Sequence, residues 1–260
     1  MAASDEGGFH GPTIYEFFPD VIFFAGTWFE INRIILVRFI AVIALVLFFW
    51  LGTRKLKVIP GRGQSIVELG MGFAENSISM SVLGQKDGKR FLPLITAIFF
   101  MVLFMNLTGV IPGLNIAGTS VIGVPLLLAL IAYGAFIYAG VKKSPSGFFR
   151  NALFPAGVPW GLYFLVTPIE FISTFLIRPV TLTLRLMMNM MVGHLLLVLF
   201  FAGTQFFFFN AGGFYALFGV GTLAFGFVFT LFEVLIAVLQ AFIFGILTAV
   251  YIQLALLDDH

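Results

Sequence analysis

Five long apolar runs constrain the fold of this chain more than any other feature of its sequence. They cover residues 31–51, 91–111, 121–141, 160–210 and 214–257. An apolar run of about 18 residues or more can cross the hydrocarbon core of a bilayer as a helix. The composition agrees, because 60% of the residues are hydrophobic and 10% are charged, whereas soluble domains carry about 25% charged residues. We therefore predict an all-α integral membrane protein with about five transmembrane helices, in a single membrane domain over residues 1–260.

Two segments outside the runs have their own expected places. Residues 1–30 form a polar segment that we expect outside the membrane, and their acidic start is unlike a targeting peptide. Residues 61–83 are less apolar, with hydrophobic residues at helical spacing between polar ones. This pattern predicts an amphipathic helix at the cytoplasmic surface of the bilayer. An ordinary surface helix or loop fits the pattern as well.

The basic residues predict the orientation of the chain. Two loops hold ten of the fourteen Lys and Arg residues: Arg54, Lys55, Lys57, Arg62, Lys86, Lys89 and Arg90 after the first run, and Lys142, Lys143 and Arg150 after the third. Short basic loops stay on the cytoplasmic side. Five spans then place the N-terminus outside and the tail Asp258–His260 inside. Arg33 and Arg38 oppose this assignment weakly, and we interpret them as snorkelling at the outer edge of the first span.

Several function classes are excluded by residues that the sequence lacks or scatters. There is no Cys, which excludes disulfides and thiolate metal sites, and the three His residues are far apart. The chain has no phosphate-binding loop for a nucleotide, and its cations form no stripe for nucleic acid. We therefore expect no metal and no other cofactor, and no bond chemistry by this chain itself.

The last two runs are too long for simple upright spans. Each is about 44 to 50 residues, or roughly 65 to 75 Å as a helix, against a hydrocarbon core of about 30 Å. The turn at Gly212-Gly213 makes them an antiparallel pair. We expect them to tilt strongly, to break, or to run partly along the interface, and Pro168 and Pro179 permit a kink.

Four charged residues lie inside these runs: Glu170, Arg178, Arg185 and Glu233. A charge at bilayer depth costs about 3 kcal/mol, so such residues face protein or water and often mark ion paths. A salt bridge or snorkelling explains Glu170 and Arg178 equally well, because both lie near the cytoplasmic start of the fourth span. Apolar sequence surrounds Arg185 and Glu233 on both sides, which favours a functional role for these two residues.

Equal distance from the turn predicts which residues of the two last spans share a depth. Arg185 should lie level with Gln240, and His194 level with Glu233. Asn189 follows Arg185 by four residues and shares its helix face. His and Glu can titrate near physiological pH, whereas Arg keeps its charge. The pattern therefore predicts a proton path beside a permanent cation.

Three stretches, residues 178–195, 233–251 and 105–112, together resemble subunit a of F-type ATP synthases in residues, order and spacing. The resemblance implies two offset half-channels that serve a rotating ring of c subunits, with Arg185 meeting the ring carboxylate. It assigns the proton path to Asn106, Glu170, Asn189, His194, Glu233 and Gln240. Here the acid and the imidazole are exchanged relative to some members. Glu170 is offset by about one residue, and Gly109 stands where some members place an acid.

The resemblance also implies partners and a location. The expected partners are the c-subunit ring, the b subunits of the peripheral stalk and the lipid bilayer, and the expected location is a bacterial plasma membrane. The chain would be a non-catalytic subunit, with protons as the expected ion and Na⁺ also conceivable. A secondary transporter and a structural membrane scaffold are the alternatives.

Overall fold

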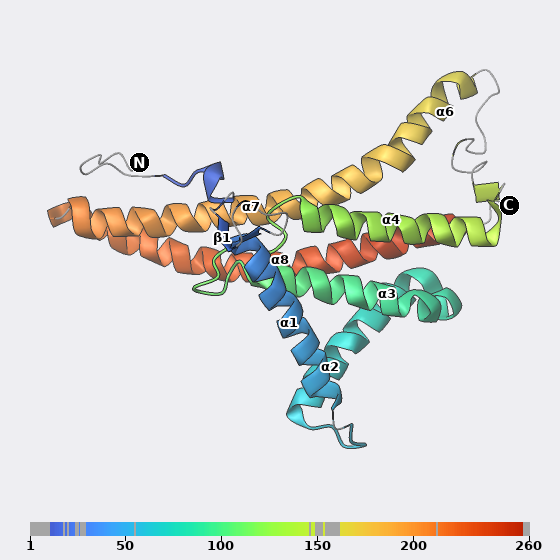
Figure 1. Cartoon of the computed structure of the whole chain (residues 1–260), viewed down its shortest axis with the longest axis horizontal. Coiled ribbons are helices and arrows are strands. Elements are labelled where there is room, and N and C mark those ends of the chain that lie inside the picture. Colours follow the sequence, from blue (N-terminus) through green and yellow to red (C-terminus); the bar gives the residue numbers. More distant parts are fainter. Residues whose placement is uncertain are drawn as a thin grey trace.

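The computed structural model describes residues 11–17, 19, 21–23, 26, 30–54, 56–145, 147–148, 153, 162–211 and 213–256. Five helices in it are long and apolar enough to cross a membrane, and the described residues are predominantly helical (Figure 1). The predicted all-α membrane fold class is therefore confirmed. The predicted orientation and helix pairing also involve residues that lie outside the described ones, namely Lys55, Arg150, Gly212 and the tail Asp258–His260.

The N-terminal elements lead directly into the first span. A short 3₁₀ helix, η1 (Ile14–Phe17), precedes strand β1 (Val21–Phe23), which pairs antiparallel with β2 (Ile31–Asn32). Helix α1 (Arg33–Thr53) follows without a break. Asn32 caps it, because its Oδ1 accepts a hydrogen bond of 3.0 Å from the backbone N–H of Ile35.

The second apolar run belongs to a longer, bent helical unit. Helix α2 (Arg62–Phe73) continues through the π-helical turn η2 (Ala74–Met80) into α3 (Ser81–Leu107). Gly84 has φ +74° and ψ −177°, a conformation that breaks the helix and reverses the chain. Figure 1 shows α2 leaving the end of α1 and α3 returning from that corner. The predicted helix over 61–83 thus corresponds to α2 and η2, while its place at the bilayer surface stays a prediction.

The three later runs form one helix of ordinary length and two very long ones. Helix α4 covers Gly123–Lys143. The next helical stretch consists of α6 (Tyr163–Phe171), η4 (Ile172–Ile177), α7 (Arg178–Gln205) and η5 (Phe206–Ala211). Its 48 residues from Tyr163 to Asn210 are apolar enough to cross a membrane. After the turn η6 (Gly213–Tyr215), α8 covers Ala216–Leu256. Two π-helical turns interrupt the longer of these helices near its ends.

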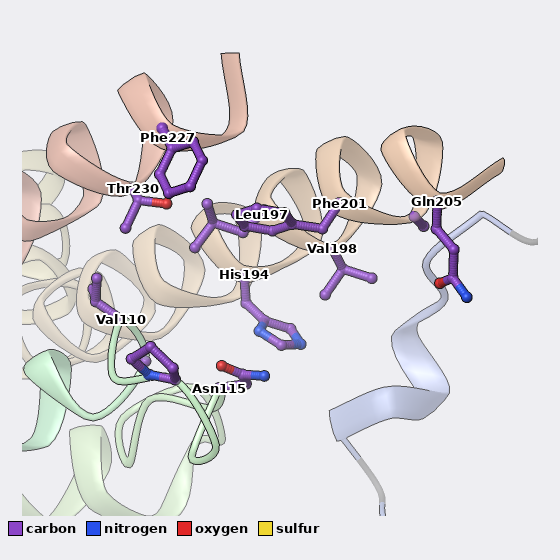
Figure 2. Close-up of a pocket in the computed structure, with 12 residues that line it drawn as sticks. Val110, Asn115, His194, Leu197, Val198, Phe201, Gln205, Phe227 and Thr230 are labelled. Carbon is purple, nitrogen blue, oxygen red and sulfur yellow. The ribbon is translucent and has the colours of Figure 1, made fainter. Parts of the chain in front are cut away.

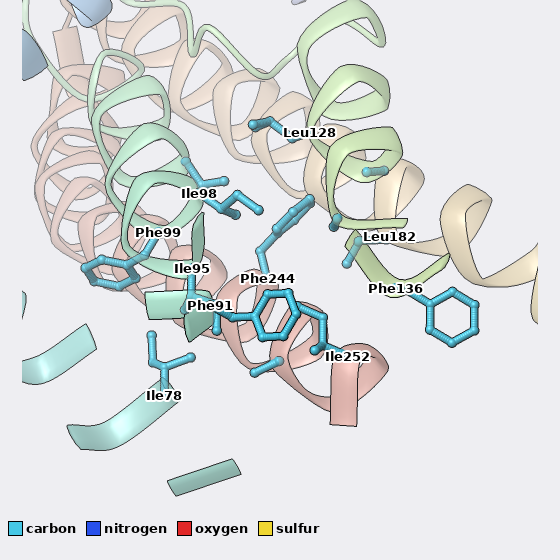
Figure 3. Close-up of a cluster of buried hydrophobic side chains, with 14 of the residues drawn as sticks. Ile78, Phe91, Ile95, Ile98, Phe99, Leu128, Phe136, Leu182, Phe244 and Ile252 are labelled. Atoms are coloured by element: carbon cyan, nitrogen blue, oxygen red, sulfur yellow. The ribbon is translucent and has the colours of Figure 1, made fainter. Parts of the chain in front are cut away.

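The core lies where α3, α4, α7 and α8 pack together (Figure 3). Large side chains such as Ile95, Phe244 and Ile252 are fully buried there, between alanines that are also fully buried. Helices in membranes associate through close packing of small residues, because lipid is as apolar as the side chains. This packing fixes α7 against α8 and so positions the polar residues of these two helices.

Candidate functional site

Helices α7 and α8 pack with the register that equal distance from the turn predicts. The side chain of Asn189 donates a hydrogen bond of 2.9 Å to Oε1 of Gln240. Nearer the turn, the hydroxyl groups of Thr204 and Thr222 lie 2.9 Å apart. Between these two contacts, the side chain of Glu233 packs against Gly193 of α7, the residue that precedes His194. Five polar residues therefore lie along the interface between α7 and α8, namely Asn189, Thr204, Thr222, Glu233 and Gln240.

Arg185 lies on the side of α7 that this chain leaves uncovered. Its side chain is exposed, together with those of Leu184 and Met188, whereas Leu186 and Met190 on the opposite side are buried. Within the part of the chain that the structure describes, the guanidinium makes no hydrogen bond or ion pair. A bare cation on a membrane-spanning helix costs about 3 kcal/mol. The guanidinium is therefore accessible to a group that lies outside the described residues.

Beside Arg185, the pair of Asn189 and Gln240 joins the two helices. Gln240 is 3% exposed, and its Nε2 has no hydrogen-bond partner among the described residues. The sequence predicted that Gln240 lies level with Arg185. In the structure Gln240 accepts a hydrogen bond from Asn189, which follows Arg185 by four residues on the same face of α7. A buried amide with a spare donor can hold water or a passing carboxylate.

Glu233 presents a buried carboxyl group to α7. It is 2% exposed, and its Oε2 has no hydrogen-bond partner among the described residues. The other oxygen lies close to Gly193: a Cβ at that glycine would be 2.9 Å from Oε1. A side chain at Gly193 would therefore force this carboxyl group to shift. Gly193 is therefore part of the site, although sequence reasoning gave it no role.

His194 lines a cavity of about 480 Å³ (Figure 2). The cavity lies between α7, α8 and the loop that follows α3, and its polar lining includes Asn115, Gln205 and Thr230 besides the imidazole. A space of this size holds several water molecules. Gly109 also lines it. The arrangement can therefore bring water to an imidazole on α7.

Asn106 lies at the end of α3, just before this loop. It is fully buried, its Oδ1 accepts a hydrogen bond of 2.5 Å from Thr119, and its Nδ2 has no partner among the described residues. Asn106 does not line the cavity itself. Gly109 and Val110, which follow it by three and four residues, do line the cavity.

Arg33 and Arg38 hold the loop after α3 in place. Arg38 donates from Nε to the Gly118 carbonyl (2.9 Å) and from Nη2 to the Val121 carbonyl (3.2 Å). Arg33 bonds the carbonyl of Leu114 at 2.9 Å. Both side chains, interpreted from the sequence as snorkelling, bind backbone carbonyls of a loop that is distant in sequence. They tie α1 to the wall of the cavity.

The structure does not bring Glu170 to these residues. It is half-buried on α6, and at 1.5 Å per residue it lies about 22 Å along the helix from Arg185. Arg178 lies between the two, with its guanidinium 5.8 Å from the ring centre of Tyr251. Glu170 is therefore a candidate for the far end of a path, and not for the cluster around Arg185.

Sequence reasoning missed several residues of the cavity. Thr230 precedes Glu233 by three residues and so shares its helix face, and Gln205 is a lone amide in an apolar run. Both are polar residues within an apolar run, the same feature that predicted a role for Asn189. Asn115, which has φ +50° in the loop, carried none, because its place depends on the contacts of Arg33 and Arg38.

Comparison with known proteins gives a consistent result over nearly the whole chain. The sequence model of the family described as ATP synthase A chain matches residues 35–253. A protein of Rhodococcus erythropolis named ATP synthase subunit a is 47% identical, over 99% of this chain and 94% of its own length. Proteins of the same name from Pseudarthrobacter chlorophenolicus and Frankia alni are 35% and 36% identical, over 100% and 96% of this chain. The matches cover 98% and 86% of their own lengths.

Proposed function

The chain belongs to the ATP synthase A chain family, and we propose that it is the stator that conducts protons between the two faces of the membrane and a rotating ring of c subunits. The family places it in the membrane sector of the ATP synthase, where it works with other subunits. The finer proposal is that it provides two offset half-channels, and that Arg185 separates them at the ring.

The exposed guanidinium of Arg185 carries this proposal. It lies on a membrane-spanning helix, on an apolar face that no part of the described chain covers. A carboxylate on a neighbouring subunit would neutralise it, and a protonated carboxyl group would not. An acid that reaches Arg185 is therefore driven to release its proton, and protons cannot pass the fixed cation directly.

The cavity beside His194 supports the outer half-channel. Water in the cavity reaches the imidazole, and Glu233 lies at the same level on α8. In the proposed path a proton enters there, passes His194 and Glu233, and loads a ring carboxylate. Asn106 lies behind the loop that forms one wall, where it orients polar groups near the entry.

The other half-channel begins at the pair of Asn189 and Gln240. After almost a full turn of the ring, the acid meets Arg185 from the other side and releases its proton there. The amide groups of Asn189 and Gln240 hold the water that accepts it, and Glu170 lies towards the cytoplasmic exit. Each proton that crosses a potential of 100 mV supplies about 2.3 kcal/mol.

Replacing Arg185 tests the proposal directly. In membrane vesicles that contain the whole complex, Arg185→Ala should abolish ATP-driven proton pumping, because nothing then forces deprotonation of the ring acid. Arg62→Ala is the matched control, since Arg62 is exposed at the start of α2 and should pump normally. Normal pumping by Arg185→Ala, in a complex assembled at the usual level, would reject the role and favour a structural scaffold.

Copurification tests the proposed partners. A tag on this chain should recover a c-subunit oligomer, the b subunits of the peripheral stalk and the soluble ATPase subunits from bacterial plasma membranes. A secondary transporter would be recovered without them and would move a solute in the absence of ATP.

A further inference from the structure

The N-terminal segment contains one side chain whose burial the proposed proton path does not explain. Phe17, the last residue of η1, is 1% exposed, whereas Tyr15 in the same short helix is 83% exposed. Segments near a chain terminus stay in place only where specific contacts hold them. Phe17 therefore anchors η1 to the rest of the protein.

The ring of Phe17 packs against the imidazole of His194. The two ring centres are 5.2 Å apart and the ring planes make an angle of 72°, an edge-to-face arrangement. This geometry is one that aromatic pairs prefer over parallel stacking, because the positive edge of one ring meets the negative face of the other. His194 itself is only 6% exposed.

The imidazole thus lies between Phe17 and the cavity. Figure 2 shows the imidazole extending from α7 towards Asn115, with the ribbon of η1 near it. Phe17 is not among the residues that line the cavity. It packs against His194 from outside that space, so the imidazole has water-accessible volume on one side and an apolar ring on the other.

Other contacts fix the position of Phe17 relative to the cavity. Pairing of β1 with β2 ties the N-terminal segment to the start of α1. From α1, Arg33 and Arg38 bind carbonyls of the loop that carries Asn115. The segment, the first span and the cavity wall are therefore joined through bonds that do not involve His194.

We propose that Phe17 is a positioning residue that holds the imidazole of His194 towards the cavity and closes the side of that ring that faces away from it. The inference rests on the proposed proton path, because it gives His194 a task that depends on orientation. Removing the Phe17 ring leaves a space beside the imidazole. The imidazole can then rotate out of the cavity, and water can reach it from the outer side.

Thiol labelling tests the packing without relying on proton transport. The sequence has no cysteine, so Val198→Cys places a single thiol of this chain at a half-buried position in the cavity. In the purified complex in lipid nanodiscs, adding Phe17→Ala to this variant should raise the rate of maleimide labelling severalfold. Adding Tyr15→Ala instead should leave that rate unchanged.

A second reporter checks that any effect is local. Gln205→Cys lies in the cavity at a position that is already exposed, so its labelling rate should not respond to Phe17→Ala. An unchanged rate for the Val198→Cys reporter, or an equal rise with Tyr15→Ala, would overturn the proposal. So would an equal rise for the Gln205→Cys reporter, because that result indicates general loosening.

Proton pumping tests the positioning of the imidazole. Phe17→Ala should lower pumping severalfold and change its pH profile, Phe17→Leu should recover it partly, and Phe17→Tyr should recover it almost fully, because it keeps the ring. Faster labelling with an unchanged pH profile would overturn the positioning role. Normal pumping by His194→Ala would instead reject the proposed path, and the labelling result would still stand as a measurement of packing.

Discussion

At the scale of single residues, the candidate site was predicted from polar side chains within apolar helices, because burying such a side chain in a membrane costs free energy. Each of five residues interrupts an apolar run and was predicted as a site residue by this criterion, namely Arg185, Asn189, His194, Glu233 and Gln240. Their contacts could not be identified in the same way. Whether Gln240 meets Arg185 or Asn189 depends on the rotation of two helices, which the depth along each helix does not determine.

Gly193 is the residue whose role follows most directly from a contact. A Cβ at this position would lie 2.9 Å from Oε1 of Glu233, and overpacking of this kind typically costs about 1–3 kcal/mol. The carboxyl group lies at the end of a side chain that can shift, so Gly193→Ala should leave assembly near normal and lower proton pumping severalfold. Dye-reported acidification of vesicles and the yield of purified complex measure the two quantities.

A second glycine provides the control for that measurement. Gly134 is exposed on α4, and a Cβ there meets nothing within 4 Å, so Gly134→Ala should pump like the unmodified complex. If Gly193→Ala also pumped normally, the position of the Glu233 carboxyl group would be irrelevant to transport.

At the scale of elements, apolar periodicity predicted helices but not the corners between them. Residues 62–107 form one continuous stretch of 46 residues, and the reversal within it depends on the backbone of Gly84. The sequence offered Gly84 only as one glycine among 28. The β1–β2 pair was also beyond prediction, because strands this short carry no alternation of hydrophobic and polar residues.

Gly84 should therefore be intolerant of any side chain. Its conformation is one that almost only glycine adopts, and strain of this kind costs about 1–3 kcal/mol. A Cβ there meets nothing within 4 Å, so Gly84→Ala tests the backbone alone. We expect a lower melting temperature of the purified complex or a lower yield of this subunit within it.

Gly63 is the matched position, because it lies inside α2, has no neighbour within 4 Å of a Cβ, and does not have positive φ. Gly63→Ala should be neutral or stabilising by up to about 1 kcal/mol, since alanine favours a helix. If Gly84→Ala and Gly63→Ala changed the melting temperature and yield equally, the backbone conformation at Gly84 would not require glycine.

At the scale of the whole molecule, the proposed orientation is consistent with the arrangement of the ends. The start of α6, the end of α4 and the end of α8 lie towards one end of the molecule, and the corner between α2 and α3 lies near them (Figure 1). The turn between α7 and α8 lies at the opposite end. Lys142 and Lys143 in the last turn of α4, and Lys86, Lys89 and Arg90 in the first turns of α3, belong to this first group, as the charge bias of cytoplasmic loops predicts. The loop between α1 and α2 lies away from both ends of the long axis (Figure 1).

Two single cysteines decide the orientation, because the chain contains none of its own. Val58, between α1 and α2, is fully exposed, and Phe214, in the turn before α8, is 76% exposed. In intact cells a maleimide that cannot cross membranes should label Phe214→Cys and leave Val58→Cys unlabelled, and inverted vesicles should give the reverse. Labelling of the Val58→Cys variant from outside would show that the chain has the opposite orientation in the membrane. The cavity at His194 would then open to the cytoplasm, and protons that drive synthesis would have to enter through the pair of Asn189 and Gln240.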